Sequence, residues 1–194
     1  MVLNGDTTDQ GLEKLYSSIE RILKNNKILI PKVLIRNIGN HEFYDYAKSP
    51  NTNEAVKGFL DKYYNFSNEQ KVYHDTWIKG YHFISLGSEI GNTKEIGASQ
   101  AYISDTQQRW LRERLAYRYE KGKPIFVFLH QHLSKKGQSL GWIGVKQDAE
   151  VRKILSQYPE LFIFTSHTHL ALQDENITLH QPFTMVHSGA VSYV

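Results

Sequence analysis

The segment KVLIRNIGNHE, residues 32–42, joins a β-branched apolar run to a short polar loop that begins at Gly39. The apolar run, KVLIRNI, is typical of a buried strand. The loop Gly39-Asn40-His41-Glu42 then offers an amide, an imidazole and a carboxylate at the point where the strand ends. The same arrangement, a buried strand followed by polar side chains, recurs along the chain.

Three further apolar segments end in this way: residues 1–4 before Gly5-Asp6-Thr7-Thr8-Asp9, residues 125–129 before His130-Gln131-His132, and residues 161–165 before Ser166-His167-Thr168-His169. Taken alone, each loop has a common structural explanation, because an Asp after a strand often caps the next helix and a His there is often a hydrogen-bonded residue at the edge of the core. In an extended segment residues i and i+2 point the same way, so His167 and His169 face one point in space. Together the four loops favour a metal site with oxygen and imidazole ligands.

Helical patterns separate the strands. They cover residues 12–23, residues 51–64 with Thr52 or Asn53 as N-cap, a segment from Ser104 or Asp105 through Tyr119 to Gly122, and residues 145–158. Further strands are predicted at residues 71–77 and 81–86, joined by a tight turn at Lys79-Gly80, and as short pieces over residues 178–194. This alternation predicts an α/β layered fold, in which catalytic side chains follow the C-terminal ends of strands.

The composition is that of one ordinary globular domain of 194 residues, with 40% hydrophobic and 22% charged residues. The 23 Lys and Arg exceed the 20 Asp and Glu by 3 and are scattered along the chain, which argues against nucleic-acid binding by bulk charge. No apolar run approaches the roughly 18 residues of a membrane-spanning helix, and the start lacks a signal-peptide pattern, so we expect a cytoplasmic protein without a membrane partner. The chain has no cysteine and nine histidines, so a metal would be bound by imidazole, carboxylate or amide groups.

Several enzyme classes do not fit the motifs. A zinc-peptidase helix needs a second His four residues after the first, and Asp45 stands at that distance from His41. The chain also contains no Gly-Lys-Ser/Thr phosphate loop and no Gly-x-Ser-x-Gly nucleophile elbow.

The motifs GDTTD, GNHE, the His of FLHQH, and SHTH, in this order, resemble those of the calcineurin-like metallophosphoesterases, GDxxD, GNH(D/E), His and GHxH. The resemblance covers nearly the whole chain, with Ser166 where the family usually has Gly. It implies a layered α-β-β-α sandwich that hydrolyses a phosphomonoester or a small phosphodiester by metal-activated water. The stretches YHFISLGSE and DTQQRWLRERL are similar to bacterial cyclic-nucleotide phosphodiesterase-like phosphohydrolases, which implies a cyclic nucleotide as the first substrate to consider.

The resemblance also implies the metal ligands of a dinuclear centre. They would be Asp6, Asn40, His130, His167 and His169, with Asp6 bridging two divalent ions. Ligands of this mixed kind suit manganese, iron or zinc.

Catalytic and substrate-binding roles follow from the same resemblance. His41 would contact the phosphate and protonate the leaving oxygen, with Asp9 or Glu42 holding its ring. His132 stands where the family often has Pro, and is either a pocket-lining or a plain surface residue. Two aromatic residues near these motifs, Tyr44 and Trp142, would stack on the substrate or else pack as half-buried residues.

One family motif has no counterpart in this sequence. The Asp-x-His motif that precedes GDxxD would supply two ligands to the same ion as His169, so we expect one firmly held ion at Asp6, Asn40, His130 and His167 and a weak second one. An N-terminally truncated domain, which we expect here together with an abrupt C-terminus at residues 190–194, would expose a sheet edge beside residues 1–4 and favour homo-oligomers. Two alternative functions stay open: a catalytically impaired metal-binding remnant, and a metal-dependent hydrolase of a carbonyl substrate.

Overall fold

The strands of the chain form two sheets, in a computed structural model that describes residues 1–133, 144–169, 178–180 and 182–189. In the first sheet β1 (Val2–Asn4) and β2 (Ile35–Asn37) pair in parallel, with Val2 opposite Ile35. The second sheet has the order β3-β4-β5-β6-β8-β7. Its members are β3 (His74–Ile78), β4 (Tyr81–Ser85), β5 (Ile125–Phe128), β6 (Leu161–Thr165), β7 (Thr178–His180) and β8 (Thr184–His187). Strands β4, β5, β6 and β8 run parallel, and the outer strands β3 and β7 are antiparallel to their neighbours.

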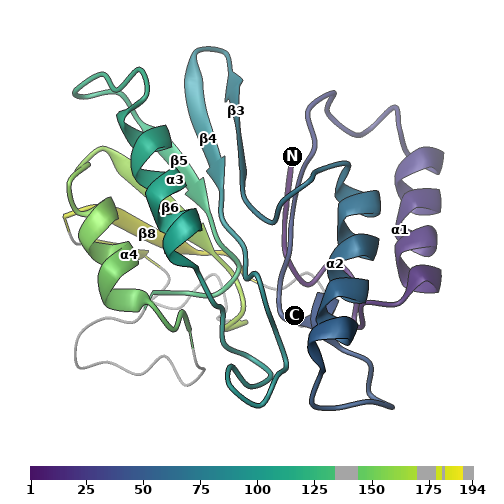
Figure 1. Ribbon diagram of the computed structural model, residues 1–194. Helices are drawn as coiled ribbons and strands as arrows, with labels where there is room; N and C mark the ends of the chain where they lie inside the picture. The colour runs from purple at the N-terminus through teal and green to yellow at the C-terminus, as the bar shows by residue number, and fades with distance from the viewer. Residues whose placement is uncertain (134–143, 170–177, 181, 190–194) are drawn as a thin grey trace.

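Helices cover both outer sides of the paired sheets. Figure 1 shows α3 (Asp105–Ala116) and α4 (Asp148–Leu155) against the six-stranded sheet, and α1 (Glu13–Asn25) and α2 (Asn53–Ser67) on the opposite side, next to β1 and β2. Along β6 the residues Leu161, Ile163 and Thr165 are fully buried while the alternate phenylalanines are half-buried, as expected for a strand with one face on the helical core. This arrangement confirms the predicted α-β-β-α layers.

Local sequence signals explain several element boundaries. The Thr52 side chain accepts a hydrogen bond from the Ala55 backbone N–H at 3.2 Å and begins α2, and Ser104 begins α3 through the Gln107 N–H at the same distance. In the turn between β3 and β4, Lys79 and Gly80 have φ values of 50° and 80°, which matches the twist of a tight hairpin. The predicted caps and hairpin are therefore confirmed.

The structure shortens some of the predicted elements. Helix α3 ends at Ala116 and not near Gly122, because Arg118 adopts a φ of 54° that a helix does not allow. Val145, expected at the start of a helix, instead forms a bridge with Ala101, so α4 begins only at Asp148. Part of the predicted C-terminal strand region, residues 190–194, lies outside the described residues.

Strand β1 pairs only with β2 among the described strands. Val2 and Leu3 line a cavity that continues toward the carboxyl end of the strand. Self-association through this edge, which we expected from the sequence, stays a prediction.

Candidate metal centre

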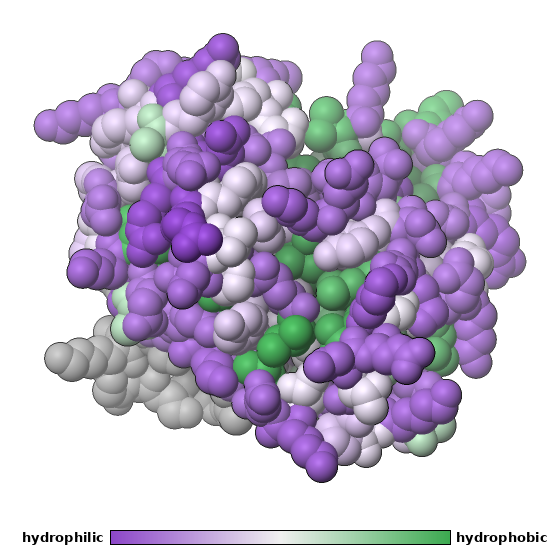
Figure 2. Space-filling model, in the orientation of Figure 1, coloured by the Kyte–Doolittle hydropathy of each residue, from purple (hydrophilic) through white to green (hydrophobic). Residues whose placement is uncertain are grey.

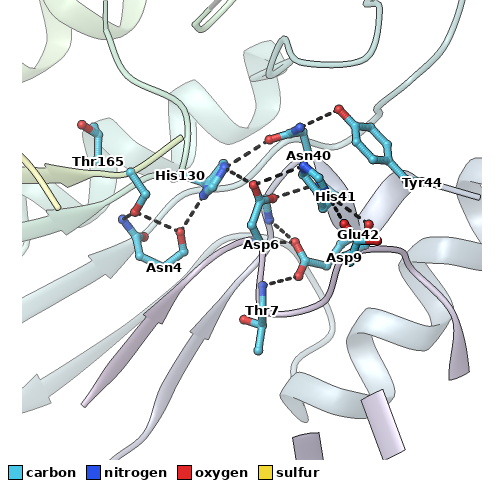
Figure 3. A network of polar contacts seen from close by, with 12 residues as sticks. Asn4, Asp6, Thr7, Asp9, Asn40, His41, Glu42, Tyr44, His130 and Thr165 are labelled. Atoms are coloured by element: carbon cyan, nitrogen blue, oxygen red, sulfur yellow. Dashed lines mark hydrogen bonds and ion pairs between the residues drawn. The ribbon is translucent and has the colours of Figure 1, made fainter. Parts of the chain in front are cut away.

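Four loops, after β1, β2, β5 and β6, bring polar side chains to one place at the carboxyl ends of these strands. One carboxylate oxygen of Asp6 and one ring nitrogen each of His130 and His167 lie within 4.8 Å of one another. The Asp6 Oδ2 and Asn40 Oδ1 atoms lie 3.0 and 3.1 Å from His130 Nε2 (Figure 3). Four of the five predicted ligands therefore converge.

The His130 ring is held by the backbone of Asn4. Its Nδ1 lies 2.8 Å from the Asn4 carbonyl oxygen, and because a carbonyl only accepts, Nδ1 carries the hydrogen. The Nε2 atom is thereby turned toward Asp6 and Asn40, the orientation that metal-binding histidines adopt. Sequence reasoning missed Asn4, whose side chain also donates to the Phe164 carbonyl at 3.1 Å and so joins β1 to β6.

The electrostatics of the cluster favour a positive charge among its oxygen atoms. Burial disfavours the charged forms of both Asp6 and His130, but their mutual attraction lowers the pKa of Asp6 to about 2 and raises the pKa of His130. Burial, reinforced by the nearby His130, lowers the pKa of His167 to about 3, so this ring is neutral, as a metal ligand must be. A carboxylate, an amide oxygen and two imidazoles are a donor set that fits a divalent transition metal.

Glycine is required at two positions beside these ligands. Gly5 has a φ of 83°, and a Cβ on it would lie 2.7 Å from the His130 ring. A Cβ on Gly39 would collide with the Asp6 carboxylate and backbone N. These contacts explain physically why Gly precedes Asp6 and Asn40 in the two motifs.

Tyr44 fixes the orientation of the Asn40 amide. The Asn40 Nδ2 donates to the Tyr44 hydroxyl at 2.6 Å, and this hydroxyl donates to the Ala98 carbonyl at 3.0 Å. Since the amide nitrogen is engaged, the amide oxygen faces His130 and the candidate metal position. The Tyr44 ring is half-buried and lies 4.5 Å from the His41 ring. Stacking of Tyr44 on a substrate stays a prediction.

Replacing Tyr44 by Phe is expected to weaken cation binding about tenfold, because the Asn40 amide loses the group that orients it. Isothermal titration of the metal-free protein with Mn²⁺ measures the affinity. Tyr81→Phe, in the β3–β4 hairpin, is a control that removes a hydroxyl from a tyrosine 42% exposed and remote in sequence from the four loops. Equal affinities of Tyr44→Phe and the parent would show that the amide is oriented without Tyr44.

His41 lies at the mouth of the same site, and Asp9 holds its ring. The ring Nδ1 lies 3.0 Å from the Asp9 carbonyl oxygen and 3.4 Å from its carboxylate, while Nε2 lies 3.9 Å from Asp6 Oδ2. The His41 backbone N–H donates to Asp6 Oδ1 at 2.9 Å. We predicted Asp9 or Glu42 as the partner of this ring, and the ring contacts are with Asp9.

Glu42 has a different position from the one we predicted. Its carboxylate is buried and accepts backbone N–H groups of Asp6 at 2.9 Å, Gly39 at 2.7 Å, Thr7 at 2.7 Å and Thr8 at 3.2 Å. Burial and the nearby Asp6 carboxylate raise the pKa of Glu42 to about 7, although the N–H donors oppose this shift. Glu42 therefore joins the loop after β1 to the loop after β2 instead of holding the His41 ring.

The remaining predicted residues are spread around the site. His169 is exposed, has a φ of 52° and lines the same cavity as His41. His132 is buried, with its ring 6.4 Å from that of His167 and 6.0 Å from that of His187, and burial lowers its pKa to about 4. It is thus a packed residue behind His167 and not the surface residue that one of our two interpretations required. Trp142 lies outside the described residues.

A cavity of about 620 Å³ joins these groups. Asp6, His41, His130, His167 and His169 line it at one end, and Val2 and Leu3 line it along β1. Its volume lies within the range of small-molecule sites, roughly 300–1,000 Å³.

Comparisons with known proteins agree with this geometry. A sequence model of the family described as calcineurin-like phosphoesterase matches residues 1–171. No curated protein sequence matches the chain. The crystal structure of a dimetal phosphatase from Danio rerio is similar with a TM-score of 0.62 at 14% identity, over 96% of this chain and 70% of that one. A protein named as a candidate 5′-nucleotidase of Staphylococcus aureus, solved with alpha-ketoglutarate, gives a TM-score of 0.50 at 12% identity, over 97% of this chain and 39% of that one. At these identities the structures share a fold with this chain.

Proposed function

Because the chain belongs to the calcineurin-like phosphoesterase family, we propose that it hydrolyses a phosphomonoester or a small phosphodiester at the cluster of Asp6, Asn40, His130 and His167. The observation that carries the proposal is the convergence of these four side chains from four separate loops, next to a cavity that Asp6, His130 and His167 line together with His41. A structural ion-pair cluster alone would not need an amide oxygen and a neutral imidazole turned to the same point.

The four side chains would hold a divalent cation, and His169 on the cavity wall would contribute to a second one. Bound there, such a cation would polarise a phosphoryl oxygen and lower the pKa of a water molecule. The Asp6 and Asn40 oxygen atoms that face His130 Nε2 both accept hydrogen bonds, so a proton on Nε2 would have to leave before this atom could become a ligand. Manganese, iron and zinc suit these ligands.

His41 would protonate the leaving oxygen of the ester. The Asp9 carbonyl accepts from Nδ1, so Nδ1 carries a hydrogen and Nε2 is the atom that gains and loses the catalytic proton. Nε2 lies on the side of Asp6, and His41 lines the cavity, so the proton is available where an ester would sit.

Replacing His41 by Ala is expected to lower kcat for an unactivated phosphodiester by about 10²–10⁴-fold with the bound metal unchanged, since general acid catalysis is lost and no ligand is removed. Hydrolysis with Mn²⁺ and metal content are measured in parallel. An aryl phosphodiester with a good leaving group serves as an internal control, because it needs little protonation and should lose much less activity. Equal losses for both substrates would contradict the acid role.

The same assay separates the proposed function from its alternatives. A parent protein that binds Mn²⁺ but hydrolyses no phosphate ester would be a metal-binding protein without turnover. Turnover of a carboxylic ester or amide, with none of any phosphate ester, would indicate a carbonyl substrate. Cyclic nucleotides and nucleoside 5′-monophosphates are the first substrates to test, because the cavity volume accommodates a nucleotide and one structure with a similar fold is named as a candidate 5′-nucleotidase.

A further inference from the structure

The most exposed large apolar side chains of the described residues lie in the loop between α1 and β2. Ile28 is 91% exposed and Leu29 is 78% exposed. Ile22 near the end of α1 and Val33 near the start of β2 are also exposed, and the Met1 ammonium group donates to the Val33 carbonyl at 3.0 Å. We call the exposed residues Ile22, Ile28, Leu29, Val33 and Met1 the apolar loop surface. Exposed apolar groups on a surface mark sites of interaction where they adjoin one another.

Basic residues dominate the sequence of this loop and its flanks. Residues 21–41 contain five basic residues and no Asp or Glu, although the whole chain has a net charge of only +3. Lys24, Lys27 and Lys32 are all exposed and flank Ile28 and Leu29 along the chain. The nearest preceding acid, Glu20, lies one helical turn before Lys24 on α1. The chain as a whole is nearly balanced in charge, but this segment is basic.

The loop lies at the edge of the molecule, with apolar and basic side chains exposed together. In Figure 1 the loop projects beyond the end of α1, and Figure 2 shows apolar atoms among strongly hydrophilic ones at the corresponding upper right. A protein surface that binds nucleic acid contacts the phosphates through polar and positively charged groups. Exposed Ile and Leu side chains would have no apolar partner there. An anionic bilayer offers an apolar layer below its headgroups for Ile28 and Leu29, and phosphate groups for the lysines.

We propose that the loop of residues 24–33 binds the surface of an anionic phospholipid membrane, with Ile28 and Leu29 inserted among the headgroups and Lys24, Lys27 and Lys32 paired with lipid phosphates. None of the helices in the described part of the chain has the length and apolarity needed to cross a bilayer. The loop lies at the amino-terminal ends of β1 and β2, whereas the candidate metal centre lies at their carboxyl ends (Figure 1). Membrane contact would therefore leave the cavity open to its substrate.

Vesicle co-sedimentation of the full chain tests the proposal. Vesicles of phosphatidylcholine with phosphatidylserine should bind the parent at least about tenfold more tightly than phosphatidylcholine alone, and high salt should weaken the binding. The double variant Ile28→Ser, Leu29→Ser and the triple variant Lys24→Gln, Lys27→Gln, Lys32→Gln should each lose about tenfold or more in affinity. Tyr81→Ser, an exposed site on the β3–β4 hairpin, should bind like the parent.

Because the altered side chains are exposed, all variants should keep the thermal unfolding midpoint of the parent. Absence of vesicle binding by the parent, or equal binding by parent and double variant, would overturn the proposal. Sedimentation velocity tests the alternative that the loop binds a second copy of the chain. A parent that forms a dimer and binds no vesicles, together with a double variant that is monomeric, would show a contact between copies and would overturn the membrane proposal.

Discussion

Replacing Asp6 by Asn is expected to remove cation binding from the candidate centre and to lower phosphate-ester hydrolysis by about 10³-fold or more. Asp6 supplies the carboxylate of the Asp6, His130 and His167 cluster, and Asn keeps its shape but not its negative charge. The amide nitrogen of Asn would also face His130 Nε2, where Asp6 Oδ2 now lies at 3.0 Å. Metal content after dialysis and hydrolysis of an aryl phosphodiester measure the two effects.

The pH dependence of stability gives the same variant a readout that does not need activity. In the metal-free parent, the lowered pKa of Asp6 contributes stability that is present above its ordinary value of 3.8 and is lost as the pH falls toward about 2. The raised pKa of His130 contributes stability that is present below 6.5 and is lost as the pH rises through the folded value. Asp6→Asn should lack both contributions.

Asp61→Asn is the matched control, because Asp61 is an exposed carboxylate that pairs with Lys57 on the same helix. It should retain metal, activity and the pH profile of the parent. Full metal content in Asp6→Asn would contradict the assignment of Asp6 as a ligand.

The convergence of the ligands was predictable from the sequence because it depends on a simple rule. Asp6, Asn40, His130 and His167 each follow a buried strand, and parallel strands of a layered fold end at the same edge. The apolar runs that mark β5 and β6 are short but strongly β-branched or aromatic, so the pattern placed them within a residue of their observed bounds. The sequence indicated Gly5 and Gly39 as the ends of the strands. It did not indicate that a Cβ at either position would collide with a neighbouring side chain or backbone.

The roles of Glu42, Tyr44 and Asn4 were not predictable from the same patterns. Glu42 and Asn4 contact groups of other loops, and Tyr44 links Asn40 of its own loop to the Ala98 carbonyl. Such contacts depend on how segments approach one another in three dimensions. Glu42 is turned inward by the short 3-10 helix of residues 41–43, which no periodicity in the sequence marks. His132, for which the sequence left a pocket-lining and a surface position open, is buried. Because β5 ends at Phe128, the alternation of the strand does not fix the direction of this side chain.

Helix α3 shows why the end of a helix is hard to predict from the sequence. The amphipathic pattern continues to Tyr119, yet the helix stops at Ala116. Tyr119 instead directs its hydroxyl to Glu160, at 3.1 Å, in the loop before β6. A tertiary contact of this kind overrides the local preference for helix.

Replacing Glu42 by Ala is expected to destabilise the protein by about 3–5 kcal/mol and to weaken cation binding at the same time. The substitution removes the acceptor of four backbone N–H groups, on Asp6, Thr7, Thr8 and Gly39, that lie in a buried or part-buried region. Each buried N–H left without an acceptor costs about 1–3 kcal/mol, and water entering the space recovers only part of this cost. Urea unfolding measures the free energy of unfolding.

The two effects of Glu42→Ala have one physical origin. The N–H groups of Asp6 and Gly39 share the Oε2 atom of Glu42, so this carboxylate sets the distance between the loop that carries Asp6 and the loop that carries Asn40. Glu42→Gln keeps one acceptor oxygen and avoids the cost of burying a charge, so its stability and Mn²⁺ affinity should lie between those of the parent and Glu42→Ala. Asp61→Ala, which removes an exposed carboxylate, should change the free energy of unfolding by no more than about 0.5 kcal/mol. A Glu42→Ala protein that unfolds at a much lower urea concentration but binds Mn²⁺ as tightly as the parent, when compared under conditions where both are folded, would show that the two loops keep their spacing without Glu42.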